Sequence, residues 1–182
     1  MTSRVERGFT LLELLLVLAL IAAITALAIP ALRGPLENAR LRTAADTLRA
    51  AFTRARLDAT RAGKIRLFRY ELGGARYRVM DWPATESQPL DEKWQTLPDG
   101  VVFLGGEAQE DSRQLDFSAA PAANAVDEID FGPALVFYPD GTTSTGQLTL
   151  KNQRDRAVTI RLRGLTASVR VGEVESLAEA TP

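Results

Sequence analysis

The chain has 182 residues, room for one ordinary domain beyond an N-terminal helix, and its 22 Lys and Arg against 23 Asp and Glu give a net charge of −1. It contains no cysteine and no histidine, which excludes disulfides, thiol nucleophiles, histidine-dependent catalytic triads and Cys/His zinc sites. Hydrophobic residues make up 46% of the chain, so nothing in the composition indicates disorder throughout.

The first predicted element is an apolar helix at residues 9–29, whose only charge is Glu13. With a rise of about 1.5 Å per residue this helix would extend roughly 30 Å, the thickness of a bilayer core, so we expect it to be transmembrane. A secretory signal peptide is the alternative. Its apolar core is typically about 7–15 residues long and precedes a small-residue cleavage site, whereas here the small residues lie inside the run.

The acid within this apolar helix needs an explanation. An ionised carboxylate in a membrane-spanning helix costs about 2.5–3.5 kcal/mol on insertion scales. Glu13 should therefore be absent unless another group neutralises its charge.

The sequence GFTLLE at residues 8–13 resembles the class III leader junction of type IV pilins and type II secretion pseudopilins. The resemblance implies that a prepilin peptidase cuts between Gly8 and Phe9 and methylates the new amino terminus on Phe9. The leader, residues 1–8, carries two arginines, as expected of a segment left on the cytoplasmic side. The remaining domain would then lie outside the cytoplasm.

Cleavage would give Glu13 a partner. The new amine of Phe9 would lie one helical turn before Glu13, and residues at i and i+4 share a helix face. The two groups could pair within one chain or across neighbouring subunits of a filament, and the resemblance favours the second. Because both charges are costly in apolar surroundings, such docking would set the register between neighbouring helices.

Residues 30–62 are expected to continue the helix as an amphipathic segment. Pro30 and Pro35 should kink or briefly break it, because proline removes a backbone donor and clashes with the preceding turn. Beyond them, apolar residues recur at spacings of four and three, which predicts one buried stripe. Its members are Leu41, Ala45, Leu48, Phe52, Ala55 and Ala59. Gly63 fits a helix stop.

A β-rich head is predicted at residues 63–172. Strands at 65–72 and 75–82 flank two glycines that suit a two-residue hairpin turn, and a shift in apolar parity between Leu67 and Phe68 predicts a bulge or a local change of face. Further strands are expected at 101–104, 134–138, 147–151, 158–162 and 167–171, the last two as a half-buried antiparallel hairpin.

Residues 105–128 are acidic and rich in Ala and Pro, with only Leu115 and Phe117 indicating a short strand. We interpret this segment as a solvated surface excursion, with a partner-binding loop as the alternative. Calcium could in principle bind to Asp127 and Glu128 of this segment together with Asp130 just beyond it. A solvated loop is favoured, and no metal site is predicted. Residues 173–182 are predicted to form an acidic flexible tail.

The head carries a second resemblance. FYPDGTT at residues 137–143, two alternating strands and the closing GLTASVRV are similar to the carboxy-terminal domain of the H-type minor pseudopilin (GspH) and its FimT-type pilus relative. The implied fold is α+β and pilin-like. A long N-terminal helix, half transmembrane and half amphipathic, would pack on an antiparallel β-sheet or β-sandwich head.

The implied function is that of a minor pseudopilin of the type II secretion system. It would be a structural subunit at or near the tip of the periplasmic pseudopilus, promoting export of folded proteins across the outer membrane. It would cross the inner membrane of a Gram-negative bacterium once, with its C-terminal domain in the periplasm. Its partners would be other major and minor pseudopilins, the prepilin peptidase, the inner-membrane assembly platform and the lipid bilayer, and no cofactor is expected.

Two other classes of function compete with this interpretation. A FimT-like minor pilin of a type IV pilus, acting in assembly or DNA uptake, would need exposed bases, for which the candidates are Arg154, Arg156, Arg161, Arg163 and Arg170. The tail after Val171 holds three acids and no base, where FimT-type relatives carry a basic motif, so nucleic acid is not an expected partner. A membrane-anchored enzyme is disfavoured because the chain has no GxSxG motif and no histidine base.

Overall fold

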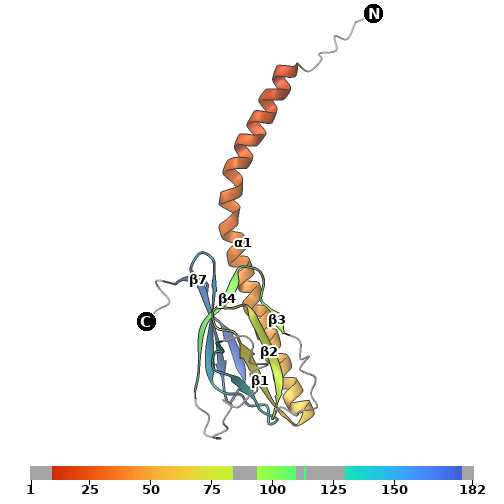
Figure 1. The fold of residues 1–182 in the computed structure, drawn as a ribbon, viewed down its shortest axis with the longest axis vertical. Coiled ribbons are helices and arrows are strands. Elements are labelled where there is room, and N and C mark those ends of the chain that lie inside the picture. The colour runs from red at the N-terminus through yellow and green to blue at the C-terminus, as the bar shows by residue number, and fades with distance from the viewer. Residues whose placement is uncertain (1–9, 84–93, 110–112, 114–129, 178–182) are drawn as a thin grey trace, which may run out of the picture. The chain divides into compact units, whose positions relative to one another are not determined.

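The structure is a computed structural model that describes residues 10–83, 94–109, 113 and 130–177 (Figure 1). The chain divides into two compact units, residues 1–36 and residues 37–182. A single helix, α1 (Leu11–Ala62), belongs to both units, and the strands that follow it belong to the second.

The strands of the second unit form two antiparallel sheets. One has the order β3-β2-β1-β5, and the other has the order β4-β6-β7-β8 with β9 also paired to β7. Their bounds are β1 (Ile65–Tyr70), β2 (Arg76–Trp82), β3 (Gln95–Thr96), β4 (Val101–Ala108), β5 (Leu135–Phe137), β6 (Gly146–Asn152), β7 (Arg156–Arg163), β8 (Ser168–Val171) and β9 (Glu175–Ser176). The predicted α+β class, a long helix followed by an antiparallel β head, is confirmed.

The C-terminal half of α1 packs on the head through the predicted stripe. All six stripe residues are at most 2% exposed, and they share one core with the inner faces of both sheets. At the centre of this core the ring of Phe52 meets Phe68 edge-on at 4.9 Å between centroids and lies 5.9 Å from Phe137. The stripe and the inner faces of the two sheets thus form one apolar core, in which the sheets also meet directly through the rings of Tyr70 and Phe103, 4.9 Å apart between centroids.

The helix ends where the sequence predicts. Gly63 has a φ of 64°, and the amide of Lys64 donates to the carbonyl of Ala59 at 3.3 Å. This is the pattern of a helix C-terminus closed by a glycine in the left-handed conformation, which costs glycine nothing sterically.

The prolines of α1 do not interrupt it. The helix runs without a gap from Leu11 to Ala62, through Pro30 and Pro35, so the brief break that the sequence allowed does not occur. A proline inside a helix removes one hydrogen bond and crowds one carbonyl, which can bend the axis without ending the helix. The predicted kink at these residues stays a prediction.

The first hairpin forms, but its turn is longer than predicted. β1 and β2 pair from Ile65 with Trp82 to Tyr70 with Tyr77. Beyond them the amide of Glu71 donates to the carbonyl of Arg76 at 3.0 Å, leaving residues 72–75 in the loop, so the two-residue turn is wrong. The tightest two-residue turn needs positive φ at both central positions, whereas only Gly73 has it here, at 72°.

The bulge or face change predicted between Leu67 and Phe68 is also wrong. Their register with β2 is continuous, and they point to opposite faces of the sheet. Phe68 enters the main core, while Leu67 enters a second cluster with Met80, Val136 and Tyr138. A strand buried on both faces loses its apolar alternation, which explains the misleading parity. The bulge that does occur lies in β4, between Phe103 and Gly105.

The remaining strands follow the predictions with shifted ends. β4 extends to Ala108, so the predicted excursion does not begin at residue 105. The strand predicted around Leu115 and Phe117 lies outside the described residues. The tail is not wholly flexible as predicted, because β9 pairs with the start of β7 and the amide of Leu177 donates to the carbonyl of Asp155 at 2.7 Å. Residues 178–182 lie outside the described part of the chain.

Candidate functional site

The predicted docking residue Glu13 lies in the first turn of α1, in a capped helix start. The hydroxyl of Thr10 accepts a hydrogen bond from the amide of Glu13 at 3.3 Å, and the carbonyl of Thr10 accepts from the amide of Leu14 at 3.2 Å. A threonine followed three residues later by a glutamate has the spacing of a capping box, so a sequence signal for this helix start exists but was not used to predict it. The helix N-terminus favours a negative charge at this position. Gly8 and Phe9 lie outside the described residues.

The surface around Glu13 is apolar and exposed. Every residue from 10 to 26 is exposed, and the large apolar side chains in this range run from 43% exposure at Val17 to 78% at Leu11. Glu13 is the only charged side chain among them. An exposed apolar surface of this extent requires an apolar environment or a partner. Within the part of the chain that the structure describes, no helix is long and apolar enough to cross a membrane.

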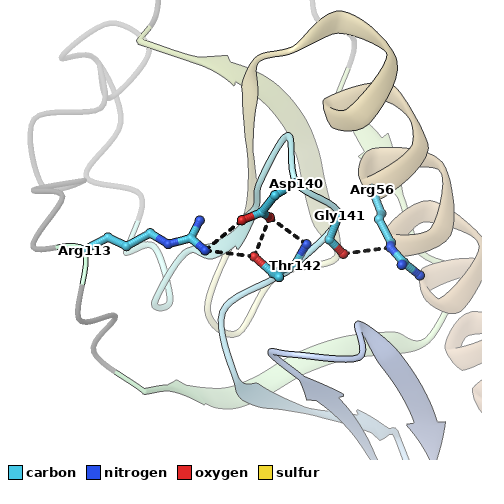
Figure 2. Close-up of polar contacts among 5 residues, drawn as sticks. All are labelled: Arg56, Arg113, Asp140, Gly141 and Thr142. Carbon is cyan, nitrogen blue, oxygen red and sulfur yellow. Dashed lines mark hydrogen bonds and ion pairs between the residues drawn. The ribbon is translucent and has the colours of Figure 1, made fainter.

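The C-terminal half of α1 is fixed to the head by polar contacts as well as by the stripe. Near its start, Glu37 forms an ion pair with Arg154 at 2.9 Å, and Asn38 accepts a hydrogen bond from Asn152 at 3.4 Å. Near its end, the Nε of Arg56 donates to the carbonyl of Gly141 at 2.9 Å (Figure 2). Arg154, one candidate for a nucleic-acid contact, is therefore already engaged within the chain.

The turn after Tyr138 is organised by Asp140 (Figure 2). One carboxylate oxygen accepts from the amide of Thr142 at 2.9 Å and from its hydroxyl at 2.6 Å, and the other accepts from Arg113 at 2.9 Å. These hydrogen bonds, those from Thr142 first, hold the pKa of Asp140 below its usual value. The guanidinium of Arg113 also lies 3.8 Å from the ring centroid of Tyr138. Asp140 is thus a turn former.

The role of Arg113 could not be predicted from the sequence. It lies 27 residues before Asp140, in a stretch without periodicity, so no local signal marks the contact.

The acids considered as calcium ligands are not brought together in the described part of the chain. Asp127 and Glu128 lie outside the described residues. Among the residues that the structure describes, no group of three or more potential metal ligands occurs.

The arginines of the last hairpin are brought together by the fold. Arg161 on β7 lies directly opposite Arg170 on β8, and Arg163 follows on the same outer face. All three are exposed. Arg156, at the start of β7, is partly buried and pairs with β9.

Comparison with known proteins gives two family matches and two similar solved structures. Residues 3–29 match the prokaryotic N-terminal methylation motif, and residues 44–166 match the family described as type II transport protein GspH. Two solved structures of the minor pseudopilin EpsH from the type 2 secretion system of Vibrio cholerae are similar. One is 14% identical, with 74% of this chain and 96% of that chain covered and a TM-score of 0.49. The other is 12% identical, with 76% and 97% covered and a TM-score of 0.47. None of the curated proteins matches the chain.

The chain has a methylation motif at the start of one long helix, and the second half of this helix packs on antiparallel sheets. These features define a pilin-like protein. More narrowly, the chain belongs to the GspH family of type II secretion minor pseudopilins, whose members are structural proteins and not enzymes.

Proposed function

We propose that this protein is a subunit at or near the tip of the periplasmic pseudopilus, where it promotes export of folded proteins across the outer membrane. The family match supports the secretion system, and the exposed apolar helix supports a role in assembly. In this proposal the leader, residues 1–8, is removed by the prepilin peptidase between Gly8 and Phe9, and Phe9 is methylated. Residues 9–29 then hold the subunit in the inner membrane with its head in the periplasm.

The observation that carries the proposal is the isolation of Glu13. It is the one charge on an exposed apolar surface, residues 10–26, and its backbone amide is already satisfied by Thr10. Among the described residues, no group forms an ion pair or hydrogen bond with the Glu13 carboxylate, so in our proposal it meets the amine of Phe9 from a neighbouring subunit. A buried charge without a partner is strongly destabilising, so helices would associate stably only in the register that pairs the two groups.

The core of the head is built from its own unit, residues 37–182. The stripe of α1 and the inner faces of both sheets are buried in this core. What remains for other major and minor pseudopilins, and for the inner-membrane assembly platform, is the apolar first half of α1 and the outer surface of the head.

The proposal is tested by deleting the gene in its own host and scoring export of extracellular enzymes, twitching motility and DNA uptake. Complementation uses the wild type, Glu13→Ala and the matched control Asp46→Ala, which removes an exposed acid from the head-packed half of α1. We expect the wild type and Asp46→Ala to restore export and Glu13→Ala to fail. Restored export with Glu13→Ala would contradict the docking role. Intact export with lost motility or uptake in the deletion strain would assign the protein to a type IV pilus.

A further inference from the structure

A row of polar side chains crosses the outer face of the second sheet. The register places Glu107 of β4 opposite Gln147 of β6, Gln147 opposite Arg161 of β7, and Arg161 opposite Arg170 of β8. The side chain of Gln147 donates to the carboxylate of Glu107 at 3.0 Å. Since neighbouring residues such as Leu162 point into the core, this row faces away from the body of the head.

Arg161 and Arg170 form an unfavourable pair. Like charges directly opposite on adjacent strands are destabilising, and Arg163 adds a third positive charge on the same face. Other arginines in the described part of the chain, such as Arg76 and Arg154, have acid partners at 2.9 Å. Within that same part, none of the three hairpin arginines makes an ion pair. The fold therefore presents a cluster of guanidinium groups that its own described carboxylates do not neutralise.

Two surface hollows adjoin the arginine pair, and both are lined by Arg161 and Arg170. The larger, of about 510 Å³, lies toward β4 and is lined by Glu107, Gln109 and Thr145 among others. The smaller, of about 270 Å³, lies toward β9 and is lined by residues that include Thr159, Gly172, Glu173 and Glu175. The pair thus stands between two depressions, each with room for side chains of an incoming segment.

We propose that this surface, defined by Arg161, Arg163 and Arg170, is a docking site for an acidic segment of a neighbouring pseudopilus subunit. The identity of the neighbour rests on the proposed function. Guanidinium groups bind carboxylates through paired, charge-assisted hydrogen bonds, so one or two Asp or Glu side chains would neutralise the cluster. A carboxylate lying over Arg161 and Arg170 would also relieve their mutual repulsion.

The surrounding acids favour a folded protein over nucleic acid as the occupant. Glu107 ends the polar row on one side, and Glu173 and Glu175 border the smaller hollow on the other. A nucleic-acid backbone carries negative charge along its whole length and would be repelled at both margins. A protein segment can place carboxylates only over the arginines and polar or basic groups over the acids.

The first test measures binding by the full chain in detergent micelles. The probe is a fluorescein-labelled peptide of about eight alternating Glu and Leu residues, with the corresponding Gln and Leu peptide and a DNA duplex for comparison. We expect the acidic peptide to bind and the double variant Arg161→Gln, Arg170→Gln to weaken binding at least about tenfold, as the loss of paired charge-assisted hydrogen bonds predicts. The control Arg42→Gln, Arg49→Gln removes two exposed charges from α1 and should bind as the wild type does.

The melting temperature separates this role from a structural one. The Arg161→Gln, Arg170→Gln variant lacks the repulsion between these two arginines, so its melting temperature should be unchanged or slightly raised. A lowered melting temperature would show that the arginines stabilise the head and would overturn the proposal. So would absence of peptide binding by the wild type, equal loss in the control variant, or tighter binding of the duplex that depends on the same arginines.

Export in the host distinguishes failure of this inference from failure of the proposed function. The inference expects both Glu13→Ala and the double arginine variant to reduce export. If Glu13→Ala abolishes export and the arginine variant exports normally, the docking site is wrong and the proposed function stands. If both variants export normally, the docking role of Glu13 is wrong as well, and if the deletion strain itself exports normally, the proposed function is wrong.

Discussion

The two halves of α1 share one secondary structure, but only the second half buries its apolar residues in the head. Residues 10–26 are apolar on all sides and exposed, whereas residues 37–62 carry a single apolar stripe that is at most 2% exposed in the head. A helix that is apolar all round needs an environment outside its own chain, while a striped helix needs one inside it. The hydrophobic pattern therefore separates the part of the helix that packs in the head from the part that, in our proposal, takes part in assembly.

The largest effect should come from removing a core side chain of the folding half. Phe52→Ala should lower the free energy of unfolding of the full chain in detergent micelles by about 3–5 kcal/mol, because it leaves a cavity between α1 and the sheet that contains β1 and β5. The matched variant Leu16→Ala, at a position 62% exposed, should leave it nearly unchanged. Chemical denaturation monitored by tryptophan fluorescence measures both. Equal losses of unfolding free energy in the two variants would contradict the distinction between the halves.

A smaller effect is expected at the end of the folding half. Gly63 has a φ of 64°, and an added Cβ would meet no atom within 4 Å, so Gly63→Ala isolates the backbone cost, about 1–2 kcal/mol. Gly105→Ala is the control, because a Cβ there also meets nothing and no positive φ is required. Thermal denaturation of the two variants should show a loss only for Gly63→Ala. A comparable loss at Gly105 would indicate that the backbone conformation is not the cause.

The head core should also respond to alkaline pH. Burial raises the pKa of Tyr70 to about 12 from its ordinary 10.0, so the folded state resists losing this proton while the unfolded state releases it. The corresponding stability is present below about pH 10 and is lost as the pH rises toward 12. Between about pH 8 and pH 11, the melting temperature of Tyr70→Phe should therefore fall by less than that of the wild type. Parallel pH profiles of the two proteins would contradict this.

The smallest effect is expected at the exposed turn. Because hydrogen bonds from Thr142 and Arg113 lower the pKa of Asp140, its contribution is present above the unfolded pKa and disappears as the pH falls through the lower folded value. Asp140→Asn should melt slightly below the wild type at neutral pH, and the difference should shrink on acidification. Asp46→Asn, an exposed acid on α1, serves as the control. A difference that persists in acid would assign the loss to turn geometry.

The elements with a strong local period could be predicted from the sequence. The stripe of α1, the stop at Gly63 and the last hairpin each depend on the spacing of neighbouring residues, and each is confirmed. Where two faces of a strand are both covered, as at Leu67 and Phe68, alternation disappears and the prediction was wrong. Local patterns carry no information on what covers the second face.

The candidate sites also differ in how far the sequence alone could predict them. Glu13 could be found because one acid in an apolar run is visible without a structure. The arginines of the last hairpin could be placed on its outer face, but the row from Glu107 to Arg170 depends on the register of four strands, of which β4 is far from the other three in sequence. The contact between Arg113 and Asp140 likewise depends on the fold alone.

The most direct test of the central claim is the amount of Glu13→Gln protein recovered in isolated pseudopilus filaments, beside the melting temperature of the same variant. Glutamine keeps the size and polarity of the side chain and removes its charge. We expect the variant to melt as the wild type does, because Glu13 is not a member of the head core, and to be missing from the filaments. Recovery equal to the wild type would contradict the claim that the first half of α1 docks through the charge of Glu13.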